Sequence, residues 1–135
     1  MEETTIELAR ERVEDPQLLF HGGMGLKLIE FRKGYVETEV ILEDRHRNPS
    51  GGVHGGLLMS MADDTAGAAV ISHGTPATTS SCSMNFLRAN PKTKKIVAKA
   101  TAIKVGKRLG VSEVKLYDDE DTLLATGLFE YAILS

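Results

Sequence analysis

The chain has 135 residues, of which 41% are hydrophobic, and a formal net charge of −3. This length fits one domain with a core of its own, so we assign residues 1–135 to a single domain with residues 1–20 as a helical N-terminal extension. No apolar run reaches the length of a membrane span, the first residues are acidic, unlike a signal peptide, and the single Cys82 excludes an internal disulfide, which together predict a cytoplasmic protein that does not bind membranes.

The first quarter of the chain predicts two short helices and a hairpin. One helix is expected over Thr5–Arg12, and a second begins at Asp15-Pro16 and ends at Gly22-Gly23. Two strands, Gly25–Phe31 and Tyr35–Leu42, then flank a turn at residues 33–34, because their apolar and polar residues alternate.

A glycine-rich loop leads into the most informative segment of the chain. The loop covers residues 48–56 and opens a helix predicted over Gly55–Ser72, whose apolar residues surround it on all sides. Such a helix is expected to be buried. Two acids, Asp63 and Asp64, lie halfway along it, and buried acids are costly unless they are paired or functional.

Four strands separated by turns are predicted after the helix, in the order of a meander. They cover Thr78–Leu87, Ile96–Val105, Arg108–Tyr117 and Leu123–Leu134. A hairpin, a long buried helix and four further strands predict an α+β fold, in which an antiparallel sheet wraps around one central helix.

The helix offers two chemical groups that one chain cannot bring together. Gly55 lies at the helix head, where free N–H groups and the dipole favour negative charge, so its N–H could receive an oxyanion. Asp63 follows eight residues later, which is about 12 Å along a helix. Two antiparallel copies of the helix from two subunits could place both groups at one carbonyl, so the sequence predicts at least a dimer if both serve one reaction.

Each candidate residue also has a structural interpretation. Asp63 could be a general base or nucleophile or a solvated acid, and periodicity does not choose between it and Asp64. His54 could shape the loop or orient substrate, Asn48 could be a turn residue or hold a water molecule or thioester, and Gly55 could serve tight packing alone. The spacing of the histidines and acids does not match a metal motif, so no metal and no cofactor is expected.

Charge is unevenly distributed along the chain. The span from Thr65 to Ser112 contains no acid but half of the 16 basic residues. It could be a solvated surface or a site for a phosphorylated ligand, whereas nucleic acid is disfavoured because the rest of the chain is acidic. The candidate ligands of a phosphate are Arg88, Lys94, Lys95, Lys107 and Arg108.

The loop and helix resemble the hot-dog-fold acyl-CoA thioesterases of the phenylacetate-pathway (PaaI-like) type. The resemblance is carried by residues 46–56, by Asp63 nine residues after His54, by residues 84–89 (Met-Asn-Phe-Leu-Arg-Ala) and by residues 106–108. It covers the chain from about Gly25 to the C-terminus.

This resemblance implies hydrolysis of an acyl-CoA or aryl-CoA thioester by a homodimer, commonly packed as a homotetramer. It implies that Asp63 is the catalytic carboxylate, that Gly55 is the oxyanion glycine with His54 and Gly56 beside it, and that Asn48 places the water or thioester. It further implies that Ser81 assists the carboxylate, and that Asn48 and Gly55 of one subunit face Asp63 and Ser81 of the other.

Two other functions fit the same fold. One is a non-catalytic acyl-CoA-binding or sensor module, which the position of Asp63 disfavours. The other is a dehydratase of 3-hydroxyacyl thioesters, which would need a histidine and an acid acting beside the thioester, whereas His54 lies at the helix head.

Overall fold

The computed structural model describes residues 7–8, 10–11 and 19–134. Within the predicted helix over residues 5–12, the described residues 7–8 and 10–11 are helical, whereas the predicted helix start at Asp15-Pro16 lies outside the described residues. The described end of the second helix is α2 (Leu19–Met24). This helix ends one residue after the predicted Gly22-Gly23, because the turn is made at Gly25, which has a φ of 79° and donates its N–H to Gly22 O at 3.1 Å.

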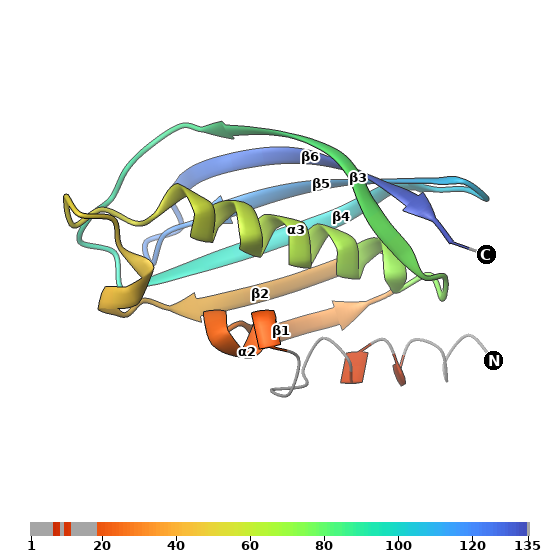
Figure 1. Ribbon diagram of the computed structural model, residues 1–135, viewed down its shortest axis with the longest axis horizontal. Helices are drawn as coiled ribbons and strands as arrows, with labels where there is room; N and C mark the ends of the chain where they lie inside the picture. Colours follow the sequence, from red (N-terminus) through yellow and green to blue (C-terminus); the bar gives the residue numbers. More distant parts are fainter. Residues whose placement is uncertain (1–6, 9, 12–18, 135) are drawn as a thin grey trace.

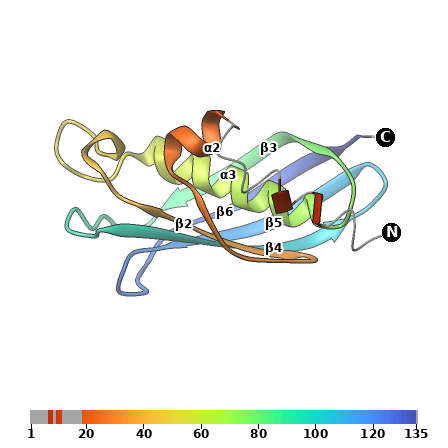
Figure 2. The same cartoon turned by 90° about the horizontal axis from the view of Figure 1, so that it is seen from below.

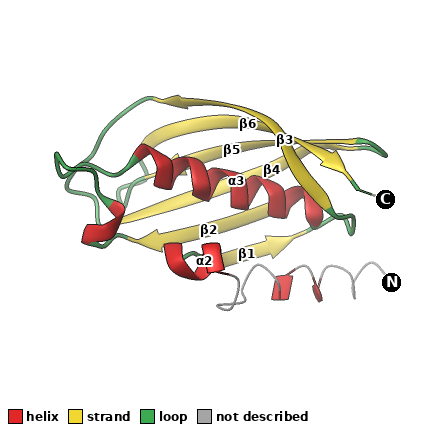
Figure 3. Cartoon of the chain, in the orientation of Figure 1, coloured by secondary structure: helices red, strands yellow, loops and turns green. Residues whose placement is uncertain are grey.

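Within the described residues, six antiparallel strands form one sheet (Figures 1 and 3), and their bounds agree with the predicted strands to within two residues. They are β1 (Lys27–Arg32), β2 (Tyr35–Ile41), β3 (Ala77–Phe86), β4 (Lys95–Val105), β5 (Leu109–Tyr117) and β6 (Leu123–Ile133).

The order of the strands differs from the predicted meander. The order across the sheet is β1-β2-β4-β5-β6-β3, so β3 pairs with β6 and forms an edge, while β4 pairs with β2 and β5. The short turns at residues 106–108 and 118–122 keep β4, β5 and β6 adjacent. The longer connection over residues 87–94 lets the chain pass from the edge strand β3 to the middle of the sheet.

Helix α3 (Gly55–Ile71) lies along one face of the sheet, as Figure 2 shows from below. Its sheet-facing residues are fully buried and mostly small, for example Ala62, Ala66 and Ala69. Strand β5 approaches the helix so closely that a Cβ added at Gly110 would lie 2.7 Å from Val70 Cγ1. The small residues therefore set the distance between helix and sheet.

Buried hydrogen bonds fix the rotation of α3 on the sheet. Thr65 Oγ1 lies 2.7 Å from Thr38 Oγ1 on β2, and Ser112 Oγ on β5 donates to Ala66 O at 2.9 Å. At the end of the helix, Ser72 Oγ accepts from Gly34 N at 2.7 Å. Because an unpaired buried polar group costs about 1–3 kcal/mol, the helix cannot turn or slide without breaking these bonds at a large cost.

We expect Gly110→Ala to destabilise the protein by about 1–3 kcal/mol, the usual cost of overpacking a core. The matched control is Gly106→Ala, where the nearest contacts of a Cβ are at an ordinary 3.6 Å. Urea unfolding of both variants measures the difference. Equal free energies of unfolding would show that the helix is not packed tightly against β5.

Candidate active site

The head of α3 carries a free backbone donor. His54 caps the helix, since its Nδ1 accepts from Gly56 N at 2.8 Å and its carbonyl accepts from Leu57 N at 3.0 Å. The N–H of Gly55 has no acceptor in the described part of the chain. A donor at the positive end of a helix is suited to bind developing negative charge.

Gly55 lines a pocket of about 280 Å³ together with Asn48, Phe86 and Arg88. A Cβ at Gly55 would lie 3.8 Å from the Phe86 ring, which is ordinary contact, so the fold itself leaves room for a side chain. Gly56 differs, because a Cβ there would lie 2.9 Å from His54 Nδ1 and would displace the cap. The protein therefore leaves less room for a side chain at Gly56 than at Gly55.

Asn48 holds the loop that forms the wall of this pocket. Its Oδ1 accepts from Ser50 N at 3.1 Å, from Ser50 Oγ at 2.7 Å and from Gly52 N at 3.1 Å. These bonds fix the side chain of Asn48, so its amide group keeps one position beside Gly55 in the pocket.

Arg47 fixes the same loop from outside, a role that no sequence pattern indicates. Its guanidinium donates to the carbonyls of Gly51 at 3.1 Å, Pro91 at 2.8 Å and Thr93 at 3.0 Å. It therefore connects the Asn48 loop to the β3–β4 connection that carries Arg88.

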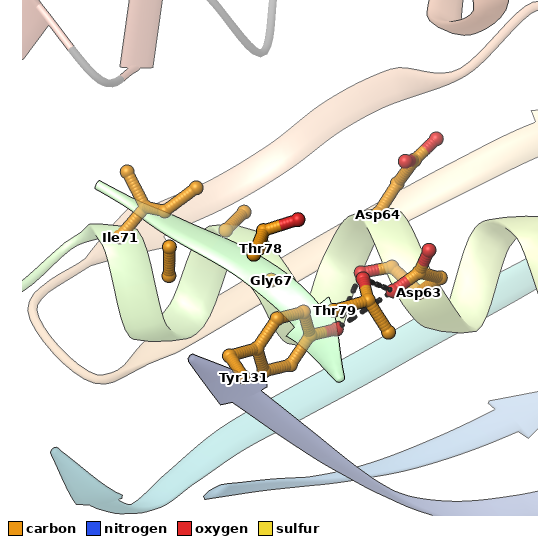
Figure 4. A pocket seen from close by; sticks show the side chains of 9 residues that line it. Asp63, Asp64, Gly67, Ile71, Thr78, Thr79 and Tyr131 are labelled. Atoms are coloured by element: carbon orange, nitrogen blue, oxygen red, sulfur yellow. Dashed lines mark hydrogen bonds between the residues drawn. The ribbon is translucent and has the colours of Figure 1, made fainter. Parts of the chain in front are cut away.

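Asp63 lies on the middle of α3 at a second pocket, of about 220 Å³ (Figure 4). Its Oδ1 accepts from Thr79 Oγ1 at 2.7 Å and from Tyr131 OH at 3.0 Å. The Tyr131 hydroxyl also lies 2.8 Å from Asp63 O. In one protomer Asp63 is half-buried rather than buried as we predicted.

Tyr131 remains a hydrogen-bond donor beside this carboxylate. Burial, followed by the negative charge of Asp63 and the hydrogen bond to it, raises the pKa of the Tyr131 phenol. The side chain of Asp64 lines the same pocket but points away from Tyr131 in Figure 4. The surroundings of Asp63 and Asp64 therefore differ, which the periodicity of the sequence does not predict.

Ser81 does not contact Asp63 within the protomer. Its Oγ donates to Glu130 Oε2 at 2.8 Å, whereas Thr79 provides the hydroxyl at Asp63. The pairing of β3 with β6 shifts between Thr79 and Ser81, which marks a bulge that sequence alternation does not reveal. The role of Ser81 stays a prediction that these contacts do not support.

The two pockets share no lining residue. Asn48 and Gly55 belong to one pocket and Asp63 to the other, with eight residues of rigid helix, about 12 Å, between the glycine and the acid. One protomer therefore holds the glycine and the acid in two separate pockets.

The predicted phosphate ligands fall into two groups. Arg88 lines the Gly55 pocket, and Lys94 and Lys95 lie at the start of β4, at the same end of the sheet. Lys107 and Arg108 lie in the turn after the opposite end of β4, about 33 Å away at 3.3 Å per residue. The two groups do not meet within one protomer.

The arrangement of the sheet and the helix defines the class of fold. A six-stranded antiparallel sheet with one long helix along its face is the predicted hot-dog fold. None of the described helices is long and apolar enough to cross a membrane.

The chain belongs to the thioesterase superfamily, whose family model matches residues 50–125. The predicted enzyme class, a thioester hydrolase, is thereby confirmed at the level of the family. The chain is 26% identical over 102 residues to the acyl-coenzyme A thioesterase PaaI of Escherichia coli, a match that covers 76% of this chain and 73% of that protein. This agrees with the predicted PaaI-like type.

Other relatives match over most of this chain. A putative esterase of Archaeoglobus fulgidus is 26% identical over 73% of this chain, and the match spans 64% of the archaeal protein. The structure of a conserved protein from Pseudomonas aeruginosa is 28% identical, with a TM-score of 0.84 and coverage of 91% and 98% of the two chains. A hypothetical thioesterase protein from Streptococcus pneumoniae, solved with coenzyme A, has a TM-score of 0.78 at 24% identity over 82% and 86%.

Proposed function

We propose that this protein hydrolyses acyl-CoA thioesters to the free acid and CoA at sites shared between two subunits. The observation that carries the proposal is the division of the site along α3, with a free N–H at Gly55 in one pocket and a hydrogen-bonded acid, Asp63, in another. Membership of the thioesterase superfamily supports the reaction.

The roles of Asp63 and of the Gly55 N–H follow from where negative charge forms during hydrolysis. Asp63 either attacks the carbonyl carbon, with water later releasing the acid, or takes a proton from water as the water attacks. On both routes negative charge forms on the carbonyl oxygen, where the Gly55 N–H and the helix dipole stabilise it more than the neutral carbonyl. The C–S bond then breaks, and CoA leaves as a thiolate that takes up a proton.

A homodimer is proposed because a second copy can pair at the edge strand β3. Most residues of β3 are exposed in the protomer, and an edge strand presents backbone groups that another strand can satisfy. The same strand passes both pockets, since Phe86 lies near Gly55 and Thr79 contacts Asp63. Antiparallel pairing of two copies there would place each helix head opposite the other subunit's acid, and we expect two dimers to form a tetramer.

We assign the CoA phosphates to the basic group formed by Arg88, Lys94 and Lys95. Arg88 is exposed at the mouth of the Gly55 pocket, and Lys94 is exposed nearby on the connection that Arg47 holds. Lys107 and Arg108 could join this group only from another subunit. The CoA-bound relative from Streptococcus pneumoniae supports CoA as the ligand class.

We expect Asp63→Asn to lower kcat for acyl-CoA at least about 100-fold, the scale of general acid–base catalysis. The matched control, Asp64→Asn, is expected to keep most activity. Release of free thiol from a panel of acyl-CoAs measures both variants. Saturable binding without thiol release by the wild type would favour a sensor, an enoyl product would favour a dehydratase, and full activity of a folded Asp63→Asn variant would refute the assignment.

Mixing two inactive variants tests the shared site. Asp63→Asn and Gly55→Val chains, exchanged in mild denaturant, are expected to regain about a quarter of wild-type activity. Random pairing makes half of the dimers hybrids, and each hybrid has one intact site out of two. Chains that exchange, as native mass spectrometry would show, but stay inactive would mean that both groups act within one subunit.

Neutralising the basic group tests the CoA phosphates. Arg88→Gln with Lys94→Gln and Lys95→Gln is expected to raise KM for acyl-CoA about 10-fold or more, while kcat for a short thioester without the nucleotide is unchanged. Lys115→Gln, whose Nζ lies 3.6 Å from Glu113 in mid-strand, serves as the control for lost charge. An unchanged KM at low salt would place the nucleotide elsewhere.

A further inference from the structure

We infer that Tyr131 is a positioning residue that fixes Asp63 through its Oδ1 and leaves Oδ2 to react. This inference rests on the proposed role of Asp63 in thioester hydrolysis. It names a residue of β6 that no motif of the sequence indicates, and it specifies which oxygen of the acid performs the chemistry.

The contacts make the two oxygens of Asp63 unequal. Oδ1 accepts from Tyr131 at 3.0 Å and from Thr79 at 2.7 Å, whereas Oδ2 receives no hydrogen bond from the described residues. The one hydrogen of the Tyr131 hydroxyl is shared between Oδ1 and the main-chain oxygen of Asp63, which lies 2.8 Å away, so the phenol contacts both the helix turn and the carboxylate that projects from it. A carboxylate held at one oxygen presents the other in a defined direction.

The position of Tyr131 is itself fixed by packing. Its side chain is 2% exposed, and its ring stacks on Phe129 with centroids 6.4 Å apart. On the helix side, Gly67 makes room for the ring, because a Cβ there would lie 3.2 Å from Tyr131 Cε2. A buried, stacked phenol changes its position little, so its hydroxyl is a preorganised donor.

Burial, together with the surrounding charges, keeps this donor protonated. Burial is the largest cause that raises the pKa of Tyr131, followed by Asp63, while Asp64 and Cys82 add to it. The hydroxyl therefore stays protonated, and able to donate, at neutral pH and well above it. Thr79 adds a second donor from the exposed strand β3.

The test is Tyr131→Phe, which removes the hydroxyl and keeps the ring. We expect kcat to fall between about 10- and 100-fold, the scale on which a misplaced catalytic group acts, with KM changed less than about 3-fold. Tyr117→Phe, on β5 with Lys99 over its ring, is the matched control.

Variants at two further positions, Gly67 and Thr79, keep the test decisive if Tyr131→Phe lowers stability. Gly67→Ala should displace the ring and lower kcat in the wild type, but add little in the Tyr131→Phe background, where no hydroxyl remains to displace. Thr79→Val should lower kcat and Thr79→Ser should restore it, since serine keeps the donor.

Different results would refute the proposed function and the positioning role of Tyr131. Absence of thiol release from the whole acyl-CoA panel, or full activity of Asp63→Asn, refutes the proposed function. If Asp63→Asn is inactive while Tyr131→Phe, Gly67→Ala and Thr79→Val keep the wild-type kcat, the function stands and the positioning role of Tyr131 is wrong.

Discussion

The fixed position of helix α3 on the sheet determines where Gly55 and Asp63 lie. Buried contacts from β2, β5 and β6 reach the helix at Thr65, Ala66 and Asp63, so it can neither rotate nor slide along the sheet. Within the helix, the rise of about 1.5 Å per residue places its head about 12 Å from its central acid. A reaction that needs both groups at one carbon must then recruit a second helix, which makes association part of the active site.

Strand β3 connects this constraint to assembly. It borders the Gly55 pocket through Phe86 and reaches Asp63 through Thr79, and it is also an edge of the sheet. A partner that pairs along β3 would therefore cover both the Gly55 pocket and the Asp63 pocket and exclude water from them. Exclusion of water strengthens the interactions of Asp63 and of the Gly55 N–H, because charges act more strongly in a medium of low dielectric constant. The hydrogen bond from the exposed Thr79 hydroxyl to Asp63 would become stronger for the same reason.

The sequence predicts the elements of this fold better than their arrangement. Strand and helix limits follow from alternation and from glycine and proline, which act locally, so the prediction of α3 differs from the structure only at Ser72. Strand order depends on contacts between distant residues, and the meander was wrong for that reason. The sequence indicates Asn48, Gly55 and Asp63 as candidate site residues, because they lie close together in the glycine-rich loop and the helix that follows it. Tyr131 was not, because the chain brings it to Asp63 only through the pairing of β6 with the edge strand.

The central claim is that the carbonyl of the substrate lies between the Gly55 N–H of one subunit and Asp63 of the other. A crystal structure with a non-hydrolysable ketone analogue of an acyl-CoA tests it most directly. We expect the analogue's carbonyl oxygen within about 3.2 Å of a Gly55 nitrogen, and its carbonyl carbon beside Asp63 Oδ2 of the second chain. An oxygen about 3.5 Å or more from Gly55 N, or an acid from the same chain as that glycine, would contradict the account.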